Sequence, residues 1–299
     1  MKILLLGSMG QVGWQLARSL SVVGELTPLH RKSDALCGDL AQHEELAATI
    51  RSLAPDVIVN AAAYTAVDLA EKERDAAFAV NAVACEVLAA EARRLGAWLV
   101  HYSTDYVFDG TGSRPWRDTD ATGPVNVYGQ SKLAGEQAVA RWERHIVLRT
   151  SWVFDTWGQN FLKSILRAAA QRDSLSVVSD QWGAPTRAAL IADVTAHVLR
   201  RLAPETAGTY HLAASGETNW HAYAQLAIEH AGNCAMALKT RPGQVRPIAT
   251  ADYPTAAARP ANSRLDTSRL RHTFGLNLPA WQDGVRSVVA ELAAARESH

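Results

Sequence analysis

The sequence predicts an α/β protein in which a doubly wound parallel sheet is followed by a smaller α/β region. In the first half of the 299 residues, short apolar segments alternate with helical patterns, as expected for parallel strands joined by crossover helices. After about residue 150, turns marked by Gly and Pro separate the remaining helices and short strands. We therefore predict a first domain over 1–150 and a second region over 151–299, and strands of that region can return to the main sheet.

The predicted strands are largely apolar, because helices are expected to cover both of their faces. They are Ile3–Leu6, Glu25–Leu29, Val57–Ala61, Trp98–Tyr102 and Ile146–Thr150, with Leu175–Val178 and Tyr210–Leu212 in the second region. Apolar residues at helical spacing predict the helices. These cover Trp14–Val23, Glu71–Leu95, Leu133–Arg144, Asn219–Ala231 and Ala280–Ala295, and a further helix follows Leu40.

Composition and charge exclude several classes of function. The chain is 48% hydrophobic and balances 30 Lys and Arg against 30 Asp and Glu, so it has no basic excess for nucleic acid or an anionic membrane. The first apolar run, Ile3–Leu6, is too short for a signal peptide, and no run approaches the roughly 20 residues that span a bilayer. Three distant cysteines and ten histidines show no metal-ligand spacing. We expect a cytoplasmic protein with no bound metal.

A glycine loop, Gly7-Ser8-Met9-Gly10-Gln11-Val12-Gly13, joins the first strand to the first helix. The loop needs a tight turn at Gly7, approach of the backbone to a pyrophosphate at Gly10, and close helix–strand packing at Gly13. Free N–H groups at the helix start would then bind the phosphates. The alternative is an ordinary turn. Its position in the first βαβ unit favours a dinucleotide cofactor and a Rossmann-type domain over 1–150.

The end of the second strand bears on the choice of cofactor. NAD-binding folds usually place an acid there for the ribose hydroxyls, whereas this chain has His30-Arg31-Lys32. Cations suit the 2′-phosphate of NADP, so we predict NADPH, with NADH also accepted. A solvated charge cluster is the equally weighted alternative. Asp39 and Leu40 are expected to bring a carboxylate and an apolar side chain near the adenine.

The stretch Tyr128-Gly129-Gln130-Ser131-Lys132 predicts a catalytic pair. Residues four apart lie on one face of a helix, and a nearby ammonium is expected to lower the tyrosine pKa from about 10. Thr104 follows the strand that ends at Tyr102, at the edge of the sheet where doubly wound folds bind ligands. Alone, the spacing would usually mark a surface pair, but beside the glycine loop it indicates a catalytic site.

These motifs resemble the extended short-chain dehydrogenase/reductase superfamily, and longer stretches narrow the resemblance to the dTDP-4-dehydrorhamnose reductase family. The similarity extends from the first strand to the helix that begins near Trp281. The stretches that carry it are Asn60–Asp68, Ser103–Gly110, Arg149–Val153, Asp180–Thr186 and Arg259–Ser263.

The resemblance implies that NADPH reduces the C4 keto group of dTDP-4-dehydro-L-rhamnose, the last step of dTDP-L-rhamnose synthesis and a supply route for lipopolysaccharide O-antigen. Tyr128 would donate the proton, Lys132 would hold the nicotinamide ribose and lower the Tyr128 pKa, and Thr104 would orient the carbonyl oxygen. Positions that match cofactor contacts are Gly10, Gln11, Val12, Asp39, Leu40, Ala63, Tyr64, Thr65 and Tyr102. Those assigned to the sugar nucleotide are Asp105, Trp152 and Arg259, although Trp152 also suits a core position and Arg259 a structural ion pair.

Two other functions stay open at this stage. An epimerase or dehydratase of the same superfamily would share the glycine loop and the Tyr/Lys pair, but the Arg149–Val153 and Asp180–Thr186 stretches favour the reductase. The regulatory β subunit of methionine adenosyltransferase also resembles this branch. The intact set of Thr104, Tyr128 and Lys132 argues against a role limited to binding.

The resemblance also implies a homodimer, which in some reductases is bridged by Mg²⁺ through three carboxylates. This chain has Gln15 and Ala188–Leu190 at two of those places, and only Glu291 matches the third. Because Mg²⁺ prefers carboxylate oxygens, we regard it as doubtful here. Any dimer is expected to form through apolar helix contacts.

Overall fold

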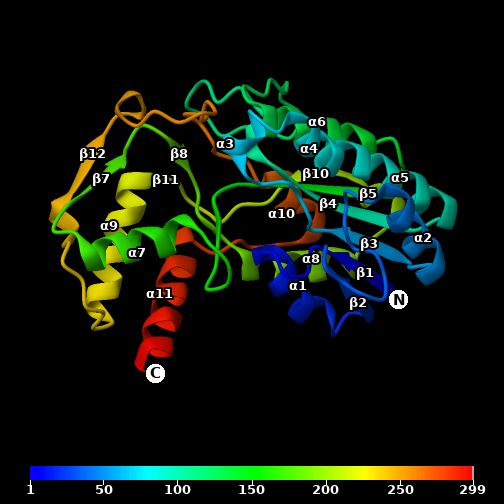
Figure 1. Cartoon of the computed structure of the whole chain (residues 1–299), viewed down its shortest axis with the longest axis horizontal. Coiled ribbons are helices and arrows are strands. Elements are labelled where there is room, and N and C mark those ends of the chain that lie inside the picture. The colour runs from blue at the N-terminus through cyan, green and yellow to red at the C-terminus, as the bar shows by residue number, and fades with distance from the viewer. Residues whose placement is uncertain (298–299) are drawn as a thin grey trace.

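The computed structural model describes residues 1–297 and centres on a sheet of six parallel strands (Figure 1). The strand order β10-β5-β4-β3-β1-β2 confirms the doubly wound prediction, and β10 comes from the second half of the chain to pair with β5. The strands are β1 Lys2–Leu6, β2 Glu25–Leu29, β3 Val57–Asn60, β4 Trp98–Thr104, β5 His145–Thr150 and β10 Gly208–His211.

Two hydrophobic cores cover the two faces of this sheet, because alternate residues of each strand point to opposite sides. Leu5 and Val59 face one core, whereas Leu4 and Ile58 face the other. Helices α1 Gln11–Leu20, α8 Ala188–Leu199 and α10 Ser268–Phe274 pack on the first face. Helices α2 His43–Leu53, α5 Ala84–Leu95 and α6 Val127–Val139 pack on the second.

The long helix expected over Glu71–Leu95 is interrupted. The chain forms the short helices α3 Val67–Ala70 and α4 Arg74–Phe78, and a π-helical turn over Ala79–Val83 then leads into α5. Asn81 in this turn is buried; it accepts a hydrogen bond from Tyr64 N at 2.9 Å and donates one to Ser131 Oγ at 2.9 Å. A π-turn of this kind often occurs at a functional site.

Helix α6 begins earlier than expected, at Val127. The Asn126 side chain caps it by accepting from Gly129 N at 2.8 Å, and Glu71 Oε1 accepts from Val127 N at 2.9 Å. The first two turns of α6 therefore contain Tyr128 and Lys132.

The second region packs the helices α7 Phe161–Gln171, α9 Trp220–Asn233 and α11 Trp281–Glu297 around a third core, at the left of Figure 1. Short strand pairs hold its loops. They are β7 Leu175–Val178 with β12 Val245–Ile248, β8 Trp182–Gly183 with β11 Thr218–Asn219, and β6 Val153–Phe154 with β9 Thr186–Arg187. Over residues 1–297, no helix combines the length and the apolar character needed to cross a membrane.

A buried ion pair joins α6 to β5. Arg149 donates to Glu136 from Nε at 2.9 Å and from Nη2 at 2.7 Å, and both side chains are less than a tenth exposed. The guanidinium also lies 5.1 Å from the centre of the Phe108 ring. The bidentate geometry satisfies both charges where water cannot reach them.

Removal of one partner should therefore be costly. We expect Glu136→Ala to lower the free energy of unfolding by about 3–5 kcal/mol, because it leaves the Arg149 charge buried without its partner. Urea denaturation measures this loss. Glu86→Ala is the control, since its pair with Arg141 is exposed and should contribute less than about 1 kcal/mol. Equal losses in the two variants would contradict a special role for the buried pair.

Candidate active site

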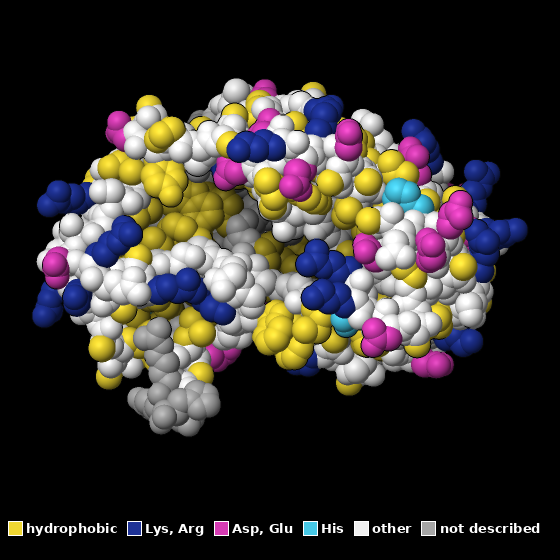
Figure 2. Space-filling model, in the orientation of Figure 1, with side chains coloured by type: hydrophobic (Ala, Val, Ile, Leu, Met, Phe, Trp, Pro, Cys, Tyr) yellow, Lys and Arg dark blue, Asp and Glu magenta, His cyan; other side chains and the backbone are white. Residues whose placement is uncertain are grey.

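The candidate site lies at the carboxyl ends of the central strands. β1 pairs with β2 on one side and β3 on the other, so the chain reverses its direction of sheet growth between β1 and β3. Ligands of doubly wound sheets bind in the crevice at such a switch point. Figure 2 shows that the surface is hollowed between the sheet and the second region, with hydrophobic side chains on one wall.

The glycine loop has the geometry of a phosphate site. Gly7 has a positive φ of 83°, and its N–H donates to Leu29 O at 2.9 Å. A Cβ on Gly13 would lie 2.0 Å from Gly7 O, so only glycine allows α1 to approach the strand this closely. Helix α1 starts at Gln11 with Gly10 as its N-cap and no capping side chain. Its first N–H groups are therefore available to an anion.

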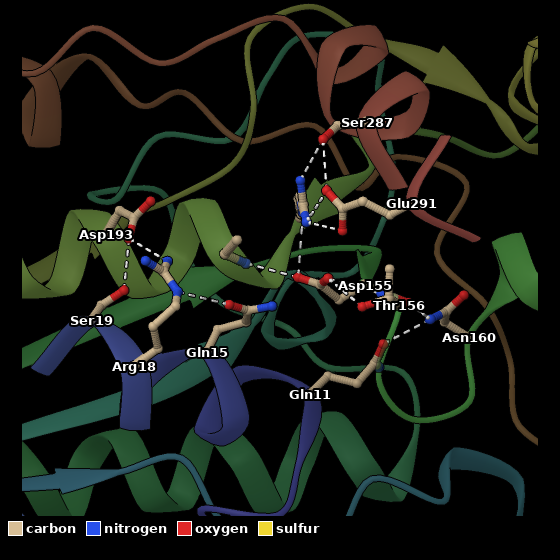
Figure 3. Close-up of polar contacts among 12 residues, drawn as sticks. Gln11, Gln15, Arg18, Ser19, Asp155, Thr156, Asn160, Asp193, Ser287 and Glu291 are labelled. Atoms are coloured by element: carbon tan, nitrogen blue, oxygen red, sulfur yellow. Dashed lines mark hydrogen bonds and ion pairs between the residues drawn. The ribbon is translucent and has the colours of Figure 1, made fainter. Parts of the chain in front are cut away.

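A loop from the second region covers the glycine loop. Asn160 Nδ2 donates to Gln11 Oε1 at 2.9 Å (Figure 3), and Trp157 Nε1 donates to Met9 O at 2.9 Å. The rings of Trp14 and Trp157 stack with centroids 4.2 Å apart. The Gln11 side chain is thus engaged by the protein, which leaves its backbone N–H as the group that faces the phosphate site.

The positions predicted near the adenosine end of the cofactor differ in exposure. The Arg31 and Lys32 side chains are exposed, and His30 Nδ1 accepts from Lys32 N at 3.1 Å. Asp39 is half-buried, and its Oδ1 accepts from Ala41 N at 3.0 Å. The Leu40 side chain lies in the core at 3% exposure.

The loop Ala63–Thr65 follows β3 and lies beside the glycine loop. A Cβ on Gly7 would meet Ala62 N at 2.6 Å, which shows how closely the two loops approach. Asn81 holds the Tyr64 backbone from both sides, and Tyr64 Oη donates to Glu73 Oε2 at 2.9 Å. Sequence reasoning missed Asn81; a lone polar residue in an Ala-rich helical pattern was the available signal.

Thr104 and Tyr128 meet at the end of β4. Thr104 Oγ1 donates to Asp105 Oδ1 at 3.2 Å and accepts from Tyr106 N at 3.2 Å. Burial raises the pKa of the Tyr128 hydroxyl to about 12, and hydrogen bonding with the Thr104 side chain offsets only part of that rise. The predicted lowering of this pKa by Lys132 is therefore wrong, because burial dominates.

Lys132 is 2% exposed, and its ammonium is held by the neighbouring strand. Nζ donates to Tyr102 O at 2.6 Å and lies 3.3 Å from His101 Nε2. Burial lowers the pKa of Lys132. Tyr102 contributes this carbonyl, but its side chain points to the opposite face, where its hydroxyl lies 2.6 Å from Thr195 Oγ1 on α8. The Tyr102 ring thus packs in the core on that face of the sheet.

Several polar atoms at the ends of β4 and β5 are buried without a hydrogen-bond partner in the described structure. They are Ser103 Oγ, Asp105 Oδ2, Thr150 Oγ1 and Ser151 Oγ. Burial raises the pKa of Asp105 to about 7. Because buried polar atoms normally have partners, this group suits a hydroxyl-rich ligand.

Trp152 occupies a strained position in the second region, with a positive φ of 49°. Its ring stacks on Trp220 with centroids 3.6 Å apart, and a Cβ on Gly183 would lie 2.8 Å from Trp152 Cε2. The half-buried indole therefore has one face against Trp220 and close backbone contact at Gly183.

Arg259 forms an ion pair with Asp68, as in the structural role considered above beside a contact with the diphosphate. Its Nη2 lies 2.6 Å from Asp68 Oδ2, and Asp68 Oδ1 accepts from Ala257 N at 3.0 Å. The backbone N–H of Ala257 and the guanidinium together lower the pKa of Asp68.

The residues at the Mg²⁺ positions implied by the family resemblance do not fit that ion. Gln15 Oε1 accepts from Arg18 Nε at 3.3 Å (Figure 3). Ala189 has no ligand atom in its side chain. Both Glu291 oxygens accept from Arg187 Nη2, at 2.8 and 2.7 Å. Among the side chains that the structure describes, no three of His, Cys, Asp or Glu are grouped to hold a metal ion.

Comparison with known proteins gives consistent matches over nearly the whole chain. The model of a family described as the RmlD substrate binding domain matches residues 1–294. The dTDP-4-dehydrorhamnose reductase of Salmonella typhimurium is 50% identical over 295 residues, 98% of each chain. A crystal structure of such a reductase from Clostridium acetobutylicum has a TM-score of 0.89 and 31% identity, and covers 98% of this chain and 99% of that one. Another, from Bacillus anthracis in complex with NADP, has a TM-score of 0.86 and 33% identity, with 97% and 99% covered.

Chelation should leave this protein unchanged. We expect catalytic activity, melting temperature and sedimentation coefficient to be the same in excess EDTA as in Mg²⁺, because Arg187 already neutralises Glu291. Activity assays, differential scanning fluorimetry and analytical ultracentrifugation measure the three quantities. If EDTA dissociates the protein or stops turnover and Mg²⁺ restores both, our interpretation of Gln15 and Ala189 is wrong.

Proposed function

The chain belongs to the dTDP-4-dehydrorhamnose reductase family, and we propose that Thr104, Tyr128 and Lys132 carry out its reaction. The protein is an oxidoreductase that uses NADPH to reduce the C4 keto group of dTDP-4-dehydro-L-rhamnose, giving dTDP-L-rhamnose. The observation that supports the site assignment is the position of Tyr128 and Lys132 in the first two turns of α6, beside Thr104 and the β1–β3 switch point.

The glycine loop and the end of β2 fit NADPH. The backbone N–H groups of Gln11, Val12 and Gly13 would bind its pyrophosphate, and the cations of His30-Arg31-Lys32 would bind its 2′-phosphate. The loop Ala63–Thr65 would line the cofactor on the β3 side. When bound, NADPH supplies the hydride that C4 accepts.

Tyr128 acts as the proton donor. Its raised pKa of about 12 keeps the hydroxyl protonated at neutral pH. The alkoxide that develops at the sugar oxygen is more basic than this phenolate, so it can take the proton from Tyr128. The Thr104 hydroxyl orients the carbonyl oxygen of the substrate. The Lys132 ammonium, which donates one hydrogen bond to Tyr102 O, holds the nicotinamide ribose.

The sugar nucleotide binds across the cleft. The unpartnered oxygens of Ser103, Asp105 and Ser151 give the sugar hydroxyls their hydrogen bonds. Trp152, which is half-buried and stacked on Trp220, offers an apolar contact to a ring of the ligand. Arg259 reaches the diphosphate if it exchanges its contact with Asp68 for a phosphate oxygen.

We further propose that residues 1–150 bind the dinucleotide and 151–299 mainly bind the sugar nucleotide, with β10 as the part of the second region that completes the main sheet. A cytoplasmic location is supported by three free cysteines, Cys37, Cys85 and Cys234. A homodimer would form through apolar helix surfaces without a metal.

The activity is tested by supplying dTDP-4-dehydro-L-rhamnose with NADPH and following absorbance at 340 nm. We expect stoichiometric loss of NADPH and dTDP-L-rhamnose as the product. An epimerase would consume no net NADPH, and a regulatory subunit would give no turnover.

Substitution of the proton donor separates chemistry from binding. We expect Tyr128→Phe to reduce kcat on the order of 10²-fold or more, while the Kd for NADPH stays nearly unchanged. Turnover is followed at 340 nm, and NADPH binding by fluorescence titration. Tyr253→Phe is the control, because Tyr253 is 60% exposed and is not among the proposed site residues. Turnover of Tyr128→Phe within about threefold of the unmodified enzyme would remove Tyr128 from the mechanism.

The cations after β2 should set a preference for NADPH over NADH. A charge-assisted contact with the 2′-phosphate contributes about 1.5–3 kcal/mol, so kcat/KM should favour NADPH roughly ten- to a hundredfold. Arg31→Ala should reduce this ratio, whereas Arg94→Ala, on the exposed face of α5, should not. Equal kcat/KM values for the two cofactors in the unmodified enzyme would show that the cluster is only solvated charge.

A further inference from the structure

A second basic side chain lies buried behind the catalytic lysine. His101 is 1% exposed and precedes Tyr102 on β4, so its ring points to the sheet face that α5 and α6 cover. Its Nε2 is 3.3 Å from Lys132 Nζ. The mechanism described above does not use this histidine. In the described structure, the hydrogen-bond partners of the ammonium are the Tyr102 backbone carbonyl and the His101 side chain.

The His101 ring is fixed on its other side as well. Nδ1 lies 3.2 Å from the side-chain Nδ2 of Asn60, and Cys85 Sγ lies 3.9 Å from both ring nitrogens. Cys85 in turn donates to Asn81 O at 3.2 Å. The imidazole is therefore held between β3 and α5 and presents Nε2 to α6.

The protonation state of this ring makes it an acceptor. Burial lowers the pKa of His101 well below its usual value, and the Lys132 charge lowers it further. A neutral imidazole has one acceptor nitrogen. Because the ammonium can only donate, Nε2 must be that acceptor, and Nδ1 then carries the proton, directed toward Cys85 Sγ.

An ammonium has three N–H donors in tetrahedral directions. Tyr102 O accepts one N–H and His101 Nε2 accepts a second, so the direction of the third N–H is fixed. With a single acceptor, the Lys132 side chain could turn about its own C–C bonds and still keep that hydrogen bond, so its remaining donors would have no fixed direction.

We propose that His101 is the positioning residue of Lys132: its Nε2 fixes the orientation of the ammonium and so aims the third N–H at the ribose of the bound cofactor. This inference rests on the role proposed for Lys132. It assigns to His101 no contact with the substrate or with the reacting atoms.

The test compares two substitutions of His101. Gln can return an acceptor to the place of Nε2, whereas Leu fills the volume without one. We expect His101→Leu to weaken NADPH binding and to lower kcat, each by about ten- to a hundredfold, and His101→Gln to recover most of both. The KM for the sugar nucleotide should change little in either variant.

A role in core packing alone predicts the opposite order. Leu suits an apolar core better than Gln, so a structural role would make His101→Leu both the more stable and the more active variant. Melting temperatures of the two proteins give the order of stability. A His101→Leu protein that is both more stable and more active than His101→Gln would overturn the proposal.

A double-mutant cycle on NADPH affinity supplies a readout that does not need turnover. If His101 acts through the ammonium, His101→Leu should change the Kd for NADPH by less than about twofold once Lys132→Met has removed Nζ. Equal effects of His101→Leu in both backgrounds would contradict the proposal. If the unmodified enzyme binds NADPH but does not reduce the keto sugar, the proposed function fails and this binding test still judges His101.

Discussion

A buried ammonium needs hydrogen-bond acceptors, and the arrangement of this site depends on how the structure supplies them to Lys132. Its Nζ reaches Tyr102 O from α6, which packs closely against the segments beside it. Two glycines allow that approach. A Cβ on Gly129 would lie 2.2 Å from Tyr106 O, and one on Gly135 would lie 2.0 Å from Asn81 O. The close packing that buries Lys132 also buries Tyr128, so the burial that disfavours charge on the lysine also keeps the tyrosine protonated.

The sheet could be predicted from sequence because its strands are locally encoded. Short β-branched or Leu-rich segments with turn residues at both ends are a strong signal, and β2 and β7 match the expected bounds. The broken helix over Glu71–Leu95 could not be predicted in this way. Its π-turn depends on Asn81, whose hydrogen bonds go to Tyr64 and Ser131, residues distant in the sequence. Helix α8 was not predicted for another reason. It is apolar on most of its surface, so its hydrophobic residues show no helical periodicity.

The features of the candidate site can be separated in the same way, into those set by local sequence and those set by distant elements. The spacing of Tyr128 and Lys132 is a local property of a helix, so the structure places both side chains in the first two turns of α6. The direction of the Tyr128 pKa shift and the core positions of Leu40 and the Tyr102 ring depend on burial by other elements, which a sequence motif does not report. Strand alternation could have found His101, since a histidine next to Tyr102 must face the other helical layer.

Charge in the second region is balanced by an internal cation. Asp155, at the end of β6, is fully buried; its Oδ1 accepts from Thr156 N at 2.8 Å and its Oδ2 from Ala189 N at 3.0 Å. Arg187 Nε lies 3.6 Å from the same Oδ2, while the other end of the guanidinium binds Glu291 on α11. One guanidinium thus links two carboxylates, and backbone N–H groups complete the buried one. Because Asp155 begins the loop that carries Trp157 and Asn160 onto the glycine loop, this link connects the position of the C-terminal helix to the cofactor site. A divalent ion at Glu291 would have to displace Arg187 and leave its charge partly buried, so the ion pair opposes binding of a metal at this place.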